Sequence, residues 1–101
     1  MKWKITYYNE TVKANIMDWS PSLLGRYVRV TDLIEKEGPN LGMPFTRSMG
    51  NGLFEGRAFF CYVVGYNIVI LHGFVKKTQN TPKKELKVAR KRLIEVLNNE
   101  L

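Results

Sequence analysis

The residue types that could do chemistry in this sequence are mostly cationic. The chain has 101 residues, with 16 Lys and Arg against 9 Asp and Glu, and a formal net charge of +7. Eight of the cations and a single acid, Glu85, fall within residues 76–92, so this segment carries the whole excess and the rest is neutral. So concentrated a charge attracts polyanions, and nucleic acid is the commonest polyanion in a cytoplasm. Charge alone leaves two interpretations open, an RNA- or DNA-binding surface and a solvated basic helix face.

Other kinds of chemistry find little support. Cys61 is the only cysteine and His72 the only histidine, which excludes a disulfide framework within the chain, a zinc site with two thiolates and a two-histidine metal site. A Ser-His-Asp triad would depend on His72 alone. No Lys-Ser/Thr pair follows Gly50-Asn51-Gly52, as a phosphate-cradling loop requires. We therefore expect neither a metal ion nor another cofactor.

The remaining candidate is a cationic site for phosphate. Arg57, Lys76 and Lys77 fall at predicted strand ends and turns, and Arg47 falls in a long loop. Guanidinium and ammonium groups stabilise the added negative charge of a phosphorane-like transition state without a metal ion. In RNA the 2′-OH is itself a nucleophile, so the protein needs only to orient the backbone, take one proton and give another.

Aromatic residues near these positions could stack a nucleobase: Tyr8, Tyr62, Tyr66 and Phe74. Each also has a purely structural interpretation, because phenylalanine is usually buried in a core. His72 lies in an apolar run, where a histidine more often has a structural partner than a catalytic role. The general base stays open, with His72 or a tyrosine as candidates.

Two helices are predicted with clear starts. Ser20-Pro21 supplies a hydroxyl N-cap and a proline at the first helical position. An apolar stripe follows until Gly38 can end the helix, which predicts a helix over residues 20–37. Thr81-Pro82 repeats the same start and predicts a helix over residues 82–98. The basic residues of this second helix fall largely off its apolar stripe, so it is amphipathic.

A small sheet is predicted between these helices from aromatic and β-branched runs and from turn residues. The expected elements are a strand over 2–8, one or two helical turns over 11–18, an irregular connection over 39–52, a short strand over 52–55, and a hairpin of strands over 58–64 and 68–75. The two hairpin runs are almost wholly apolar, so both faces of the sheet should be covered at least in part.

The length suits a single domain over residues 1–101. Its longest apolar-rich stretch, residues 58–75, is broken by glycine, asparagine and histidine, so no membrane span is expected. The first residues carry charges without a following apolar block, which does not match a signal peptide. We therefore expect a protein of the reducing cytoplasm.

Two long stretches carry a resemblance to a known family. They are GPNLGMPFTRSMGNGLFE at residues 38–55 and ILHGFVKKTQNTPKKEL at residues 70–86. Together with DWSP at residues 18–21 and ARKR at residues 89–92, they cover most of the chain in order. In these motifs the sequence resembles the phage-derived toxin-like family, a branch of the RelE/HigB toxins.

This resemblance implies a small α+β fold, with a central antiparallel sheet flanked by helices, and the toxin half of a toxin–antitoxin pair. It further implies ribosome-dependent cleavage of mRNA by attack of the 2′-OH on the adjacent phosphate, and an antitoxin partner with a helix-turn-helix domain. The candidate catalytic residues are then Arg57, Lys76, Lys77 and His72. The candidate RNA-binding residues are Arg47, Lys83, Lys84, Lys87, Arg90 and Lys91.

One departure from the family pattern affects the expected activity. In the family, the strand ending in Leu-Phe-Glu usually continues with Leu-Arg and several further residues, whereas here Glu55 is followed at once by Gly56-Arg57. The central hairpin is therefore shortened and lacks one basic residue. Two alternatives to the nuclease remain open. The shortened hairpin suggests a catalytically impaired remnant that binds antitoxin or RNA. A ParE-like inhibitor of DNA gyrase is the other alternative, because that group shares the fold.

Overall fold

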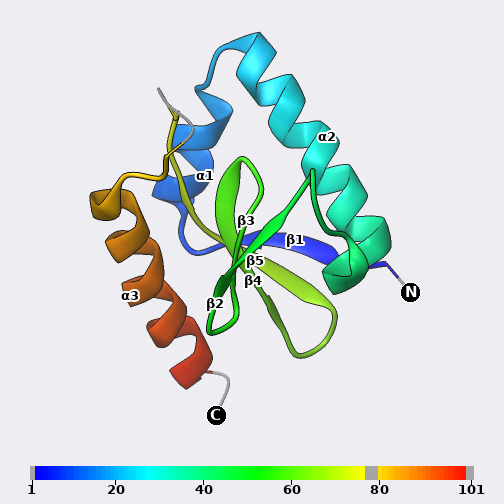
Figure 1. The fold of residues 1–101 in the computed structure, drawn as a ribbon, viewed down its shortest axis with the longest axis vertical. Coiled ribbons are helices and arrows are strands. Elements are labelled where there is room, and N and C mark those ends of the chain that lie inside the picture. The colour runs from blue at the N-terminus through cyan, green and yellow to red at the C-terminus, as the bar shows by residue number, and fades with distance from the viewer. Residues whose placement is uncertain (1, 77–79, 100–101) are drawn as a thin grey trace.

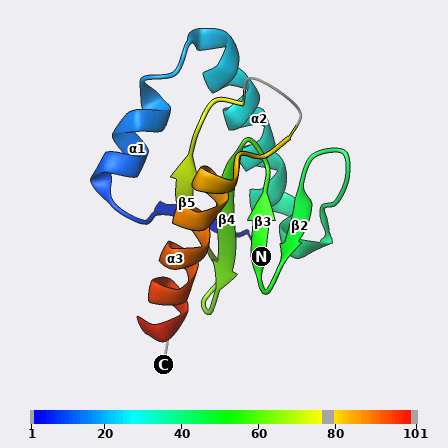
Figure 2. The same ribbon diagram turned by 60° about the vertical axis from the view of Figure 1, so that its left-hand side comes forward.

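Three helices cover the two faces of a five-stranded sheet in the computed structural model, which describes residues 2–76 and 80–99 (Figure 1). The elements are β1 (Lys4–Tyr7), α1 (Glu10–Met17), α2 (Pro21–Glu37), a 3-10 turn (Gly38–Asn40), β2 (Arg47–Gly50), β3 (Leu53–Glu55), β4 (Ala58–Val63), β5 (Asn67–Gly73) and α3 (Lys83–Asn99). Helices α1 and α2 lie on one face of the sheet and α3 crosses the other (Figure 2). The predicted α+β class is confirmed.

The sheet is mixed. Its strand order is β1-β5-β4-β3-β2. The four strands β2 to β5 are consecutive and antiparallel, whereas β1 pairs with β5 in parallel. Hairpin turns make sequential strands antiparallel, but β1 and β5 are far apart in the chain, so no short turn sets their direction. The parallel edge strand is therefore a feature that local signals do not determine.

Two apolar clusters, one on each face of the sheet, confirm that both faces of the β4–β5 hairpin are covered. Towards α1 and α2 the hairpin presents Phe60, Ile68 and Ile70, each almost fully buried. Towards α3 it presents Phe59 and Cys61, together with other buried residues of the second cluster. A strand that is buried on both faces loses the alternation of polar and apolar residues, which explains the continuous apolar runs.

The helix boundaries follow their predicted signals closely. The Ser20 hydroxyl accepts a hydrogen bond from the Leu23 amide at 3.4 Å, and Gly38 ends α2 at φ +58°. A glycine tolerates this left-handed conformation because it has no Cβ. The start of α3 differs from the predicted Thr81 cap. The Pro82 carbonyl accepts from the Leu86 amide, and the Thr81 hydroxyl donates to Glu55.

The connection over residues 39–52 is more ordered than predicted. Residues Arg47–Gly50 form strand β2, which pairs with β3 across a two-residue turn at Asn51-Gly52. Both turn residues have positive φ, +55° and +87°, as a type I′ hairpin turn requires. The prediction of an irregular segment is wrong over residues 47–50, because an Asn-Gly pair favours a hairpin turn and so places a strand on each side of it.

A β-bulge at Leu71 directs His72 towards α3. His72 lies opposite Phe59, whereas Ile70 lies opposite Phe60, so Leu71 is the extra residue on β5. Side chains along a strand normally alternate between faces, and a bulge interrupts that alternation. Leu71 and His72 therefore both lie on the face that α3 covers.

Replacing Gly73 by alanine is expected to lower the free energy of unfolding by about 1–3 kcal/mol through overpacking. An added Cβ would lie 2.6 Å from Cγ1 of Ile16, which is fully buried and cannot move aside. Gly25→Ala is the matched control, because nothing lies within 4 Å of its added Cβ and alanine favours a helix. Urea denaturation compares the two variants, and a Gly73→Ala protein as stable as Gly25→Ala would contradict the packing.

None of the helices in residues 2–76 and 80–99 is both long enough and apolar enough to cross a bilayer.

Candidate functional site

A pocket of about 630 Å³ lies where α2, the loop before β2, the β3–β4 turn and the segment after β5 meet. It is lined by Trp19, Leu23, Arg26, residues 43–47, residues 55–58 and residues 74–76. These segments are distant in the sequence and are brought together by the sheet order, in which β3 and β5 flank β4. The pocket is therefore a product of the tertiary fold.

Three of the predicted site residues line this pocket: Arg47, Arg57 and Lys76. Arg47 begins β2, Arg57 lies in the two-residue turn between β3 and β4, and Lys76 follows β5. A fourth cation that the sequence did not single out, Arg26 of α2, also lines it. The predicted Lys77 lies outside the described residues. Like charges repel, so a cluster of this kind requires an anion nearby.

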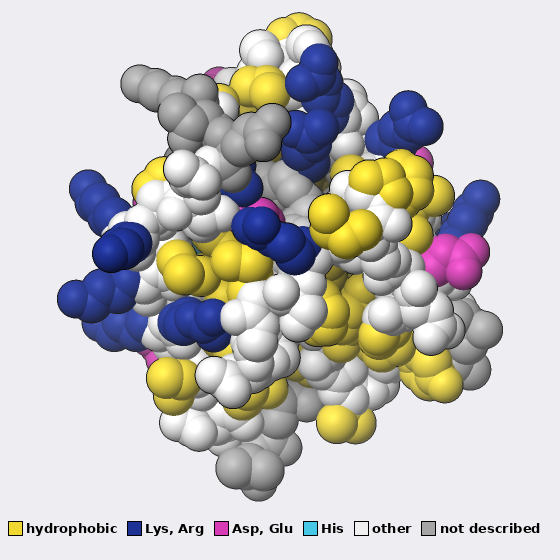
Figure 3. Space-filling model, in the orientation of Figure 1, with side chains coloured by type: hydrophobic (Ala, Val, Ile, Leu, Met, Phe, Trp, Pro, Cys, Tyr) yellow, Lys and Arg dark blue, Asp and Glu magenta, His cyan; other side chains and the backbone are white. Residues whose placement is uncertain are grey.

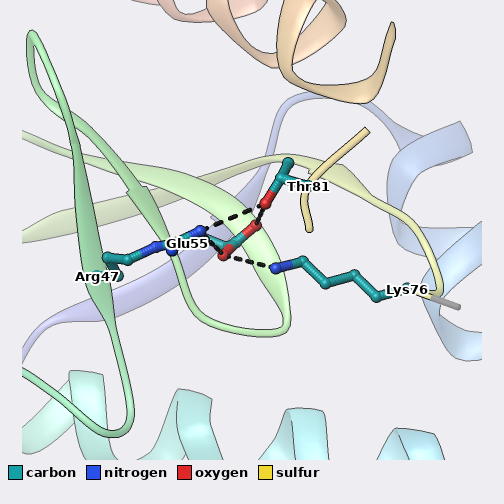
Figure 4. A network of polar contacts seen from close by, with 4 residues as sticks. All are labelled: Arg47, Glu55, Lys76 and Thr81. Atoms are coloured by element: carbon teal, nitrogen blue, oxygen red, sulfur yellow. Dashed lines mark hydrogen bonds and ion pairs between the residues drawn. The ribbon is translucent and has the colours of Figure 1, made fainter. Parts of the chain in front are cut away.

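Glu55, at the end of β3, supplies that negative charge (Figure 4). Its Oε1 accepts hydrogen bonds from Arg47 Nη2 and Lys76 Nζ, both at 3.0 Å, and its Oε2 accepts from Thr81 Oγ1 at 2.8 Å. Arg47 Nη2 also lies 3.4 Å from Thr81 Oγ1. The side chain of Glu55 is 11% exposed, whereas Arg47 and Lys76 are 48% and 30% exposed. The carboxylate thus holds both cations at the pocket with part of each still open to solvent.

The surroundings of Glu55 determine its ionisation. Burial by itself raises the pKa of a carboxyl group, because it penalises the charged form. Hydrogen bonds from Lys76 and Thr81, with the positive charges of Lys76 and Arg47, outweigh this burial and hold the pKa of Glu55 below its ordinary value of 4.5. Glu55 is therefore ionised at neutral pH.

The free energy of unfolding is expected to fall as the pH drops below 4.5 towards the lowered pKa of Glu55. The unfolded chain takes up the proton at the higher pH, so the stabilisation is fully present above pH 4.5 and lost below the folded-state pKa. Glu55→Gln keeps the shape but cannot ionise, so it removes this part of the pH dependence. Urea denaturation between about pH 6 and pH 3 measures it, and parallel curves for the two proteins would contradict the network.

Arg57 is presented by an unusual backbone. Its φ is +65°, in the left-handed region that side chains other than glycine adopt at a cost. Gly56 before it is buried, and a Cβ there would lie 3.0 Å from Thr46 Cγ2 and 3.2 Å from Val30 Cγ1. The close approach of Gly56 to α2 fixes the turn, and the exposed Arg57 projects beside the pocket. Strain at a residue that lines a pocket is a common feature of functional sites.

The structure does not bring His72 to this pocket. Its Nε2 lies 3.0 Å from Glu85 Oε1, and its Nδ1 lies 3.4 Å from Arg92 Nη1. A guanidinium group only donates hydrogen bonds, so Nδ1 accepts from Arg92 and Nε2–H donates to Glu85. Arg92 also donates to the Leu71 carbonyl at 2.8 Å. His72 thus joins β5 to α3, and its predicted catalytic role has no support from this placement.

The four aromatic candidates for base stacking do not gather at the pocket. Of the four, only Phe74 lines the pocket, and its ring packs on Phe59 with centroids 5.4 Å apart. Burial raises the pKa of Tyr62 to about 12, and the hydrogen bond to Glu95 raises the pKa of Tyr8. Both tyrosines keep their protons at neutral pH, which disfavours them as general bases.

The cations of α3 form a surface beside the pocket rather than part of it. Lys83, Lys84, Lys87 and Lys91 are exposed, and the ion pairs within the described segments do not involve them. Figure 3, drawn in the orientation of Figure 1, shows Lys and Arg side chains gathered on the side of the molecule where α3 lies. Arg90 differs, because its guanidinium donates to the carbonyls of Met49 and Gly50 and so ties α3 to β2. Thr81, just before α3, contacts Glu55, so the helix begins at the edge of the cation cluster.

Sequence reasoning missed several lining residues: Arg26, Glu55, Trp19, Met43 and Phe45. Arg47 and Glu55 are cross-strand partners on β2 and β3, but a bulge between Ser48 and Gly50 shifts the register, so equal spacing from the Asn51-Gly52 turn would have paired Glu55 with Ser48 instead. Within residues 2–76 and 80–99, no three His, Cys, Asp or Glu side chains lie close enough to hold a metal ion.

The described site lies almost wholly within a segment that matches a known family. No curated protein matches the chain significantly. A family model described as "Phage derived protein Gp49-like (DUF891)" matches residues 14–94, which include the α2, β2–β5 and Thr81 positions of the pocket and its cation cluster. The match covers most of the 101 residues. The chain therefore belongs to the family of phage-derived Gp49-like proteins.

Proposed function

We propose that this protein is the toxin of a toxin–antitoxin pair and acts as a ribosome-dependent mRNA endonuclease. Its family commonly comprises toxins of toxin–antitoxin pairs. The observation that carries the nuclease is the convergence of Arg47, Arg57 and Lys76 from separate segments on one pocket. Preorganised cations stabilise the charge that develops on phosphorus when a phosphodiester is attacked.

In the proposed reaction the 2′ oxygen of a ribose attacks the adjacent phosphorus. The bond from that oxygen to phosphorus forms as its proton passes to a base. The bond from phosphorus to the 5′ oxygen of the next nucleotide breaks as that oxygen takes a proton from water, which leaves a cyclic phosphate and a free 5′-OH. Arg57 and Lys76 hold the phosphate oxygens, and Arg47 orients the backbone, with Lys77 as a further candidate from the sequence. No step requires a metal ion.

Glu55 is the candidate for the base that takes the 2′-OH proton. It is the one carboxylate among the described residues that line the pocket, and its lowered pKa keeps it ionised. When a phosphate draws Lys76 and Arg47 towards itself, Glu55 loses part of their stabilisation, so its proton affinity rises towards that of a working base. This assignment replaces the open choice between His72 and a tyrosine.

The proposed partners follow from the same function. The substrate is mRNA on the ribosome, and the exposed lysines of α3 with Arg47 bind its backbone. An antitoxin with a helix-turn-helix domain holds the protein inactive, and both act in the cytoplasm.

Expression without the antitoxin tests the nuclease. We expect growth to stop and new mRNA 5′ ends to accumulate within translated regions, and Lys76→Ala to reduce those ends by about a hundredfold. Arg29→Ala is the matched control, because Arg29 is an exposed cation of α2 that does not line the pocket. Normal growth with intact message would refute the proposal, and intact message with DNA-damage signalling would indicate a gyrase inhibitor instead.

A second candidate is a toxin-fold protein that binds antitoxin or RNA without cutting. The observation that favours it is the short central hairpin, in which β3 has 3 residues and only Gly56-Arg57 connects it to β4. Under this alternative the wild-type chain is harmless, and lengthening the hairpin with an added arginine creates toxicity. A harmless lengthened variant would count against the alternative.

A further inference from the structure

Five apolar side chains of the pocket lining, here called the apolar wall, include three that are exposed. Met43, Phe45 and Val75 line the pocket with 73%, 38% and 48% of their surfaces exposed. Trp19 and Leu23 complete this apolar wall. Exposed apolar side chains that gather beside polar groups commonly mark a binding site. The cation cluster alone does not explain why these side chains are exposed here.

From this wall we infer that the pocket binds a nucleobase together with its phosphate, so that it takes one nucleotide of single-stranded RNA. The inference rests on the proposed function and names the part of the substrate that the apolar wall recognises. The phosphate lies on Arg57 and Lys76, and the base packs against Phe45, Met43 and Trp19.

Two parts of the apolar wall, the Trp19 ring and the backbone of the loop that carries Phe45, are held in place by the fold itself. The Trp19 ring packs edge-on against Tyr27, with centroids 5.9 Å apart, and Tyr27 is buried. The amides of Phe45 and Thr46 both donate to the Gly42 carbonyl, at 3.0 and 3.2 Å. The buried Thr46 hydroxyl donates to the Leu41 carbonyl at 3.1 Å. A rigid wall loses little conformational entropy on binding.

The two kinds of side chain in the lining favour a nucleotide. A free phosphate would use only the cations and an apolar ligand only the apolar side chains, whereas a nucleotide joins an anion to a flat apolar ring. Arg26, Arg47 and Arg57 present guanidinium groups, which bind phosphate with paired hydrogen bonds and also stack on bases. A volume of about 630 Å³ suits one compact ligand rather than an extended chain.

The experiment measures whether the base adds to binding. A short oligodeoxythymidine lacks the 2′-OH and cannot be cut by the proposed reaction, and an abasic strand of equal length carries the same phosphates. We expect calorimetry to show that oligodeoxythymidine binds about five- to a hundredfold more tightly. Phe45→Ala should remove most of this difference and leave the affinity for the abasic strand unchanged.

Ile94→Ala is the matched control, because Ile94 is an exposed apolar residue of α3 that does not line the pocket. Equal affinity for the two strands would overturn the inference. So would an acidic, apolar peptide that binds through Phe45 while oligodeoxythymidine does not, since the wall would then belong to a protein partner. Message cleavage without base-dependent binding refutes the subsite alone, and base-dependent binding with intact message refutes the nuclease alone.

Discussion

Replacing Arg57 by glycine is expected to reduce mRNA cleavage by about two to three orders of magnitude, the usual loss for one preorganised group that stabilises developing negative charge. The same change is expected to leave the free energy of unfolding unchanged or to raise it by up to about 1 kcal/mol, because glycine adopts φ +65° without the steric cost that arginine bears. A loss of activity without loss of stability separates a functional role from a structural one.

The measurements are in vitro cleavage of translated message and urea denaturation of the purified variants. Arg57→Lys is the charge-preserving comparison and should retain more activity than glycine, although lysine cannot bind phosphate oxygens in a bidentate manner. Arg29→Gly is unsuitable as a control, because it would place a glycine inside α2, so Arg29→Ala is used. If Arg57→Gly cleaved message as fast as the wild-type protein, Arg57 would have no part in the proposed active site.

The second large effect is expected on α3. Replacing Lys83, Lys84, Lys87 and Lys91 together by alanine should weaken RNA binding by about two orders of magnitude at low salt, since each phosphate contact releases counterions. The slope of log K against log salt should fall by about 3, because each contact to a single strand contributes roughly 0.7. These side chains are exposed and alanine favours a helix, so stability should be preserved.

Binding to a short non-cleavable RNA, measured at several salt concentrations, tests this surface. Lys36→Ala on α2, a single exposed cation away from α3, measures the effect of losing charge in general. An unchanged salt slope in the fourfold variant would mean that α3 is a solvated basic face with no RNA contact. Arg90 is left intact, because its hydrogen bonds to Met49 and Gly50 hold α3 against β2.

Under the proposed function, the contacts of Glu55 affect both the stability of the fold and the binding of phosphate. A carboxylate that accepts from Arg47, Lys76 and Thr81 assembles the cluster and at the same time competes with an incoming phosphate. Because several cations face one carboxylate, the pocket remains positive overall. Under the proposed function, the cations are therefore already in place when a phosphate binds and takes over contacts that Glu55 makes in the free protein.

The sequence by itself determined the parts of this protein that depend on neighbours in the chain. Ser20-Pro21 and Gly38 bound α2, and the apolar runs of β4 and β5 form a hairpin that is buried on both faces. These signals are local, since capping, periodicity and turn chemistry act over a few residues. Strand β2 could also be predicted in this way, because Asn51-Gly52 is a typical hairpin turn.

Only the tertiary structure determined which of the many charged residues line the same pocket. The strand order places Glu55, Arg57 and Lys76 at one end of neighbouring strands. The packing of α2 and of the loop before β2 adds Arg26 and the apolar wall, which no local pattern connects to them. The bulge on β5 assigns His72 to α3 instead. Contacts between distant segments arise from the packing of the whole sheet against its helices, so their pairing cannot be deduced from spacing along the chain.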